Sequence, residues 1–215
     1  LQHYPHTDPQ RLRVIPRGID PARFPRVVAP DRAARARVAT QHPQLGGDGP
    51  LLLLPGRGTR LKGHADGLDL LGALRTEGMD ARLWLPGALD PGRAAYHDEL
   101  QARAHAAGVA DALAITAPTD AMADAYAACD MVLQLSRKPE AFGRTVIEAL
   151  AVGRPVVGWA HGGVGELLAQ LQPEGAGTPF DMGVLGQRVR RLLAHPPAPA
   201  PQLQAPCRCH RSAYR

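Results

Sequence analysis

The sequence predicts an α/β fold in which a doubly wound parallel sheet carries helices on both faces. Short apolar runs alternate with longer helical stretches along most of the 215 residues, and this alternation is typical of βαβ units. The runs Leu51–Leu54 and Met131–Leu135 have the apolar character of parallel strands that are buried on both faces. We assign this domain to residues 11–195, and we find no internal repeat in it.

The order of the elements follows from these runs and from the turn residues between them. Strands are expected at residues 50–55, 81–85, 112–116, 131–135 and 155–159. Helices are expected at residues 31–41, 63–77, 91–107, 120–127, 145–152, 164–171 and 183–194. Either Thr119 or Asp120 is expected to cap the helix at 120–127. A further short strand, Val14–Ile15, is expected before a turn through Gly18.

The charge of the chain bears on its partners. The formal net charge is +5 and the pI is about 9.6, but the basic residues are scattered and aromatic residues make up only 4%. A nucleic-acid-binding protein more often has a basic stripe with interleaved aromatics, so no nucleic-acid partner is expected. No apolar run approaches the roughly eighteen residues of a membrane span, and no signal segment opens the chain. We therefore expect a cytoplasmic protein, and its charge is compatible with peripheral contact to an anionic inner membrane.

The three cysteines indicate neither a disulfide framework nor a metal site. Cys129 is expected in the core, as a small apolar residue. Cys207 and Cys209 with His210 supply too few ligands for a metal ion. The lack of a disulfide pattern fits a reducing cytoplasm. Repeated prolines exclude a regular helix in residues 196–215, which we interpret as a flexible tail.

In a doubly wound sheet, ligands bind outside the carboxyl ends of the strands, so the loops there are the candidate sites. The first such loop, Pro55–Gly63, contains glycines that let the backbone approach a ligand. A helix begins at Gly63, and helix N-termini favour anions. Because Arg57 and Lys62 add two cations, we interpret this loop as a diphosphate site. A solvated basic turn remains the alternative.

The second candidate loop follows the strand at 131–135 and contains Glu140. Gly143 permits a tight entry into the next helix, whose unpaired N–H groups, from about Phe142 to Thr145, can hold a phosphate or a sugar hydroxyl. Glu148 falls one turn inside that helix, and a carboxylate can accept two hydrogen bonds from a vicinal diol such as ribose. The alternative is that Glu148 is an ordinary helix former and Phe142 an ordinary core aromatic.

Two further loops are less specific. His161–Glu166 contains three glycines around a helix start, which suits a neighbouring phosphate or sugar. His161 is a candidate general acid or base, although a loop histidine is more often simply solvated. Ala117–Asp120 is short and stiffened by proline, so it either presents a backbone edge to a base or only caps the following helix.

At these residues the sequence resembles the C-terminal, nucleotide-sugar donor-binding domain of the retaining glycosyltransferases of family 4 (group 1), which have the GT-B fold. Gly56-Arg57…Lys62-Gly63 resembles the phosphate-binding loop of that family, and Glu140-Ala-Phe-Gly…Glu148 resembles its Glu-x7-Glu motif. Gly162-Gly163…Glu166 resembles its Gly-Gly-x-x-Glu turn, with glycine where proline is usual. The resemblance covers almost all of residues 11–170, while residues 175–181 match the next strand and loop only loosely.

The resemblance implies a role for each residue. Arg57 and Lys62 would bind the donor diphosphate and stabilise the departing nucleoside diphosphate, Glu140 would hold hydroxyls of the donor sugar, and Glu148 would hold the ribose. No segment resembles the metal-binding Asp-x-Asp motif, so we expect no metal and no cofactor besides the donor. The implied catalytic residues are Arg57, Lys62 and Glu140. The implied donor-binding residues are Gly56, Thr119 near the base, Ala141, Phe142, Gly143, Arg144, Thr145, Glu148 and Gly163.

The expected function is transfer of a glycosyl group, with retention, from a nucleoside-diphosphate sugar to an acceptor in bacterial lipopolysaccharide or polysaccharide assembly. Residues 1–10 are interpreted as a remnant of an interdomain linker, and the N-terminal acceptor domain of the same polypeptide is the expected partner. Without that domain, this chain alone is expected to bind a nucleotide sugar and to transfer little. A non-catalytic nucleotide-sugar-binding module and another GT-B enzyme, such as a sugar-nucleotide epimerase, remain alternatives.

Overall fold

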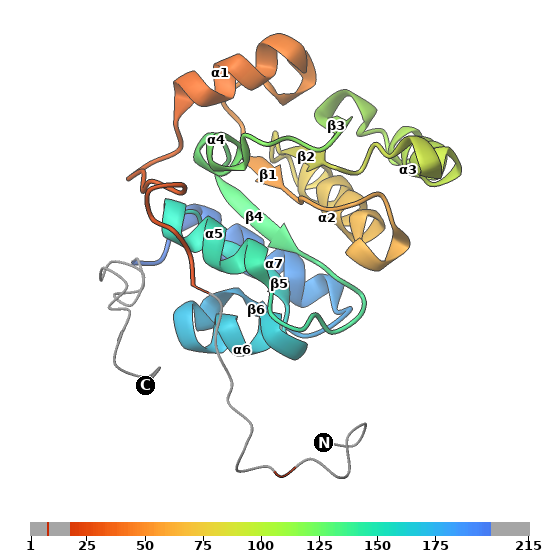
Figure 1. Cartoon of the computed structure of the whole chain (residues 1–215). Helices are drawn as coiled ribbons and strands as arrows, with labels where there is room; N and C mark the ends of the chain where they lie inside the picture. The colour runs from red at the N-terminus through yellow and green to blue at the C-terminus, as the bar shows by residue number, and fades with distance from the viewer. Residues whose placement is uncertain (1–7, 9–17, 199–215) are drawn as a thin grey trace.

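The computed structural model describes Asp8 and residues 18–198. Within that part of the chain, six parallel strands form one sheet in the order β3-β2-β1-β4-β5-β6, with helices on both faces (Figure 1). The α/β doubly wound sheet that the sequence predicts is therefore confirmed. The strands are β1 (Leu51–Leu53), β2 (Arg82–Pro86), β3 (Leu113–Thr116), β4 (Met131–Gln134), β5 (Val156–Trp159) and β6 (Ala176–Gly177).

The helices lie close to their predicted positions. The helix expected from residue 91 is interrupted, because residues 91–93 form a 3₁₀ turn that Asp90 caps by accepting a bond from the Gly92 N–H at 3.0 Å. The helix expected from residue 164 begins two residues earlier. The α-helices of the described residues are α1 (Arg32–Gln41), α2 (His64–Thr76), α3 (Ala94–Ala106), α4 (Met122–Ala128), α5 (Arg144–Val152), α6 (Gly162–Leu171) and α7 (Met182–Ala194).

The predicted cap of α4 is wrong. The N-cap residue is Ala121, and no side chain caps the helix there. Thr119 Oγ1 instead accepts a bond from the Ala121 N–H at 3.1 Å, which closes a turn before the helix. Thr119 and Asp120 consequently stand at the end of the loop after β3, and neither serves as the helix cap.

The sheet is buried on both faces because the side chains of each strand alternate between them. Leu52 and Leu54 pack in the cluster that contains the buried residues of α2, α3 and α7. Leu51 and Leu53 pack in the cluster that contains those of α4, α5 and α6. Each buried leucine contributes roughly 1.5–3 kcal/mol, so this run fixes β1 in the middle of the sheet. Cys129 is fully buried in the second cluster, which confirms its place in the core.

The direction of winding reverses between β1 and β4. From β1 the chain continues through β2 to β3 on one side, and β4, β5 and β6 fill the other side. The helices α2 and α5, which follow β1 and β4, lie on opposite faces of the sheet. The loops that leave β1 and β4 therefore diverge at the carboxyl edge, which is the edge where the strands end. Ligands bind at this point in such sheets.

Some expectations lie outside the described residues: the strand Val14–Ile15, the linker at residues 1–10, and Cys207 with Cys209 in the tail. Residues 196–198 adopt no regular secondary structure. None of the described helices combines the length and the apolar character that crossing a membrane requires.

Candidate functional site

Backbone hydrogen bonds fasten three loops of the carboxyl edge to one another. The Arg137 N–H donates to the Leu61 carbonyl at 2.8 Å, which joins the loop after β4 to the loop after β1. The Gly163 N–H donates to the Glu140 carbonyl at 2.8 Å, and Glu140 and Gly162 pair as an isolated parallel bridge. The loop after β4 is thus held on both sides, and so are the side chains that it carries.

Lys62 and Glu140 meet at the centre of this edge. Lys62 Nζ lies 2.5 Å from Glu140 Oε1, and the two side chains are 30% and 23% exposed. The carboxylate also accepts bonds from Ser136 Oγ at 2.5 Å and from Gln134 Nε2 at 3.2 Å. Burial alone would raise the pKa of Glu140, but the hydrogen bonds from Lys62 and Ser136 and the lysine charge outweigh it and hold the pKa below its ordinary value. Glu140 is therefore ionised and oriented at neutral pH.

Two glycines make room for Lys62. At Gly56, a Cβ atom would lie 3.2 Å from Lys62 Cγ, so the stem of the lysine runs along this glycine. Gly63 has φ +72°, and a Cβ atom there would lie 2.0 Å from the Leu135 carbonyl oxygen. A larger residue at Gly63 would push apart the loops after β1 and β4, and with them Lys62 and Glu140.

The start of α5 faces the same edge without a capping side chain. Its N-cap is Gly143, in the left-handed region at φ +92°, and no side chain accepts from its first N–H groups. Arg144 and the half-buried Thr145 form the first turn. Free N–H groups at a helix start attract anions and hydroxyl oxygens. Gly163 supports this turn from behind, since a Cβ atom there would lie 2.6 Å from Phe142 Cα.

Glu148 lies one turn further along α5, and its side chain is only 9% exposed. Its carboxylate accepts a bond from the Tyr126 hydroxyl at 3.0 Å and pairs with Arg144 Nε at 2.8 Å. Burial, reinforced by this carboxylate, raises the pKa of Tyr126 well above its ordinary value, so the hydroxyl stays a donor. Glu148 borders a cavity of about 360 Å³. The other lining residues are Arg23, Phe24, Thr119, Asp120, Ala121, Met122, Ala123, Asp124 and Arg144.

Three further predicted residues, Arg57, Ala141 and Phe142, are exposed or half-buried. Arg57 is exposed, and among the described residues its side chain has no hydrogen-bond or ion-pair partner. Ala141 is exposed and Phe142 is half-buried. Phe142 belongs to neither hydrophobic cluster, so its interpretation as an ordinary core aromatic is wrong.

His161 is half-buried, and it is not simply solvated. Its Nε2 lies 2.7 Å from the Ser136 carbonyl oxygen, and because a carbonyl only accepts, this nitrogen carries the proton. His161 thereby braces the loop that holds Ser136 and Glu140. The side chains of Ser136 and Gln134 were not among the predicted site residues, although a glutamine inside a buried strand is itself a signal of a polar role.

A second brace joins α2 to β5 and to the loop after β4. The buried Asp66 accepts bonds from Arg137 Nη1 at 2.5 Å and from Trp159 Nε1 at 3.3 Å. The Arg137 guanidinium lies 4.9 Å from the centre of the Phe180 ring. Arg137 consequently serves to position the loop, and its charge is already matched within the chain.

Sequence comparison places this chain in a known family. The profile of the glycosyl transferases group 1 matches residues 39–203. A D-inositol 3-phosphate glycosyltransferase of Xylanimonas cellulosilytica is 36% identical over 159 residues, which are 73% of this chain and 37% of that protein. The chain spans 37–48% of the length of the curated relatives that it matches.

Solved structures agree on the fold. HepE of Anabaena, in complex with UDP and glucose, has a TM-score of 0.69 at 22% identity over 83% of this chain and 46% of its own. WaaG, a glycosyltransferase involved in lipopolysaccharide biosynthesis, has a TM-score of 0.68 at 24% identity over 90% of this chain and 50% of its own. Because the family profile extends from the end of α1 past α7, this chain belongs to the group 1 glycosyl transferases.

Proposed function

We propose that this chain is the donor-binding domain of a retaining glycosyltransferase of family 4, and that its carboxyl edge binds a nucleoside-diphosphate sugar. The observation that carries the proposal is the arrangement of Lys62, Glu140 and Glu148 around the uncapped start of α5. A diphosphate between a sugar and a ribose needs an anion site flanked by two acceptors of hydroxyl hydrogen bonds. Lys62 and Glu140 are in contact, and Glu148 lies one turn inside the helix whose uncapped start supplies free N–H groups.

Lys62 is assigned to the diphosphate. Its ammonium has three N–H donors, so the contact with Glu140 leaves donors for a phosphate oxygen. As the bond to the sugar breaks, negative charge develops on the departing diphosphate. Lys62, Arg57 and the N–H groups of Gly143 to Thr145 are the groups that would counter this charge, which is electrostatic stabilisation by preorganised donors.

The two glutamates are assigned to the two sugars of the donor. Glu140, held ionised by Lys62 and oriented by Ser136 and Gln134, would accept bonds from hydroxyls of the transferred sugar. Glu148, oriented by Tyr126, would accept bonds from the ribose diol. Loss of Glu140 should therefore reduce transfer most, whereas loss of Glu148 should reduce nucleotide binding most.

Transfer itself is proposed for a longer polypeptide, whose N-terminal domain binds the acceptor across the crevice. The curated relatives are more than twice as long as their matched segments, which supports this. For the acceptor we propose a bacterial polysaccharide or lipopolysaccharide, since the structural neighbour WaaG is involved in lipopolysaccharide biosynthesis. A cytoplasmic position, with the basic chain touching the inner membrane, suits such an acceptor.

Calorimetry of this chain with nucleoside diphosphates and their sugars, without divalent ions, tests donor binding. We expect saturable binding that is weakened in Lys62→Ala and preserved in Arg32→Ala, which removes an exposed charge far from the crevice. Failure of every common nucleoside diphosphate to bind refutes the proposal.

A second assay tests retention and transfer. The chain joined to its acceptor domain is given labelled donor and acceptor, and the anomeric configuration of the product is read by NMR. An inverted product contradicts retention. An epimerised donor with no glycosylated product contradicts transfer and favours a sugar-nucleotide epimerase.

A further inference from the structure

The cavity beside Glu148 is also lined by residues that have no role in the proposed binding of the ribose. Besides Arg144 and Glu148 of α5, the lining includes Asp120 from the end of the loop after β3 and Asp124 from the start of α4. Both aspartate carboxylates are exposed, and within residues 18–198 neither has a hydrogen-bond or ion-pair partner. Phe24 and Met122 add apolar surface to the same cavity.

Neither carboxylate has a clear role in stabilising the local structure. α4 is a helix of only seven residues, and Asp120 does not cap it, because the N-cap is Ala121 without any side-chain bond. Asp124, in the first turn, interacts favourably with the helix dipole, but at an exposed position this effect is small. Two unpaired negative charges in a cavity for an anionic ligand lower its affinity unless the ligand offers N–H donors to them.

A nucleobase can offer those donors. The base is bonded to the ribose, so a ribose held by Glu148 places the base against another wall of the same cavity. Phe24 lies there with its ring centre 6.2 Å from that of Tyr126, and a ring face of this kind can stack on any base. Asp120 and Asp124 then border the base and can read its hydrogen-bonding edge.

We propose that this cavity selects guanine, so that the donor is a guanosine-diphosphate sugar. This inference rests on the proposed function. Guanine carries an N1–H and an adjacent N2 amino group, two parallel donors that match the two oxygens of one carboxylate. Uracil has a single N3–H between two carbonyl oxygens, which a carboxylate repels. Adenine and cytosine place an acceptor nitrogen beside their amino group, so each offers only half of the match.

The test is a titration of this chain with GDP, UDP, ADP and CDP under the same salt conditions. A bidentate match discriminates by on the order of 10- to 100-fold, so GDP is expected to bind tighter than UDP by that factor. Asp120→Asn and Asp124→Asn keep the shape but replace one acceptor oxygen by a donor. At least one of them is expected to lose most of the GDP preference while UDP binds as well as before or better.

Asp48→Asn is the matched control, because the Asp48 side chain is 98% exposed and lies outside the cavity. This variant should keep the GDP preference. Equal binding of the four diphosphates, or tighter binding of UDP, overturns the guanine assignment but leaves the proposed function intact. An unchanged GDP preference in both single variants and in the double variant overturns the role of the carboxylates. If no diphosphate binds, the proposed function itself fails.

Discussion

The two edges of the sheet both gather arginines and acidic residues, but they use them differently. At the amino edge, where the strands begin, the charged side chains pair mostly with one another and with the backbone. At the carboxyl edge, several charges either have no partner among the described residues or have one that a ligand can displace. We propose that the charges of the amino edge hold the fold and that those of the carboxyl edge bind a ligand.

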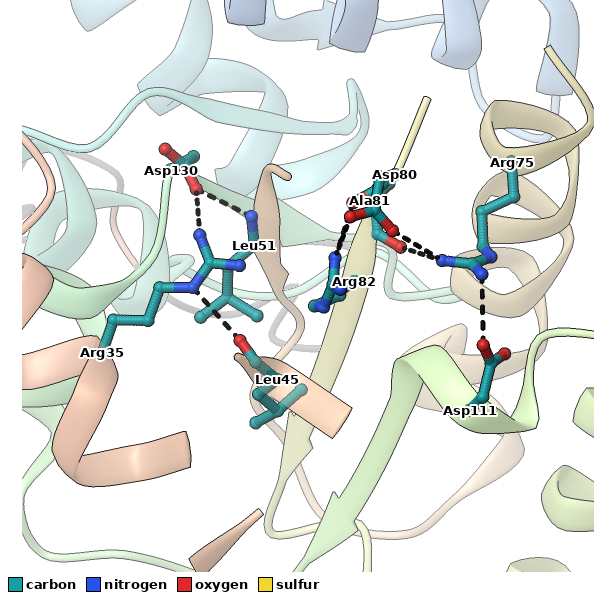
Figure 2. A network of polar contacts seen from close by, with 9 residues as sticks. All are labelled: Arg35, Leu45, Leu51, Arg75, Asp80, Ala81, Arg82, Asp111 and Asp130. Carbon is teal, nitrogen blue, oxygen red and sulfur yellow. Dashed lines mark hydrogen bonds and ion pairs between the residues drawn. The ribbon is translucent and has the colours of Figure 1, made fainter. Parts of the chain in front are cut away.

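Figure 2 shows the amino edge. Arg35 of α1 donates through Nε to the Leu45 carbonyl at 3.1 Å, and its Nη1 lies 3.6 Å from Asp130. Asp130 in turn accepts a bond from the Leu51 N–H at 2.7 Å, at the start of β1. Beside it, Asp80 lies 2.7 Å from Arg82 and 3.2 Å from Arg75. These contacts tie the beginnings of the central strands to the ends of the flanking helices.

The size of a cavity would mislead here. The amino edge borders a cavity of about 690 Å³, lined by Arg35 and Asp130 among others, whereas the cavity beside Glu148 measures about 360 Å³. In the larger cavity, Arg35 and Asp130 pair with each other, although Nη2 of Arg35 has no hydrogen-bond partner among the described residues. The smaller one contains a buried glutamate next to two unpartnered aspartates, and it adjoins a helix start without a cap. If the proposed function holds, polar groups without partners are a better guide to the site than the volume of a cavity.

The largest effect is expected from Asp130→Ala. The substitution removes the acceptor of the Leu51 N–H and leaves the mostly buried Arg35 without its ion-pair partner, which should lower the free energy of unfolding by about 3 kcal/mol. Nucleotide affinity of the folded protein should not change. Urea unfolding and calorimetry measure the two quantities. Asp48→Ala is the control, with a change within roughly 0.5 kcal/mol. A stable Asp130→Ala protein with impaired binding would reverse the roles of the two edges.

The next effect is a pH dependence that His64→Leu should remove. His64 is fully buried beside Lys62, and neither ring nitrogen has a hydrogen-bond partner among the described residues. Burial and then the lysine charge lower the pKa of His64 from 6.5 to about 4. Since the folded pKa is the lower one, the unfolded chain takes up the proton first, and stability falls as the pH drops from 6.5 to 4.

At pH 5 this loss is about 2 kcal/mol relative to neutral pH. Urea unfolding of the wild type and of His64→Leu at pH 7.5 and pH 5 measures it, and the variant should lose less stability between these values by that amount. Equal losses in the two proteins would show that His64 does not titrate in the way its burial implies.

Particular residues show how far the sequence alone reaches. The strands at the centre of the sheet were predictable, because a short run of apolar residues such as Leu51–Leu54 has to be buried on both faces, between two layers of helices. The two-residue strand β6 was not, because Ala176 and Gly177 form no apolar run. Lys62 and Glu140 were both singled out, but their direct contact joins positions 78 residues apart and depends on how two loops pack.

The residues that the sequence analysis missed also depend on how distant segments of the chain pack together. Arg23 and Phe24 line the cavity only because the segment before α1 packs beside α4 and α5. Asp120 was interpreted as a possible helix cap, which the N-cap at Ala121 contradicts, and Asp124 was not singled out. Tertiary packing decides such positions, and no local pattern records it.

An effect of about the same size is expected from Lys62→Ala, this time on binding. The lost charge-assisted contact to phosphate is worth on the order of 1.5–3 kcal/mol, so nucleoside-diphosphate affinity should fall roughly 10- to 100-fold while the melting temperature changes little. Calorimetry and thermal unfolding check the two parts. An unchanged Kd would remove the first loop from the site.

The smallest effect is expected from Arg57→Ala. Arg57 is exposed, so solvent and salt screen its attraction for a phosphate, and the affinity should fall only about three- to tenfold. The difference from the wild type should shrink as salt is raised. Arg32 is also an exposed arginine, and it lies at the amino edge, so Arg32→Ala should leave the affinity unchanged. An equal loss in both variants would mean that net charge, and not position, attracts the ligand.

The most direct test of the central claim is to follow the backbone amides of the ¹⁵N-labelled chain by NMR while a nucleoside diphosphate is added. We predict saturable shifts at the start of α5, in Gly143, Arg144 and Thr145, and at Gly63, with no change at Leu51 or Arg82 of the amino edge. Shifts that appear only at the amino edge, or no saturable shift anywhere, would contradict the claim that the unmatched groups of the carboxyl edge form the site.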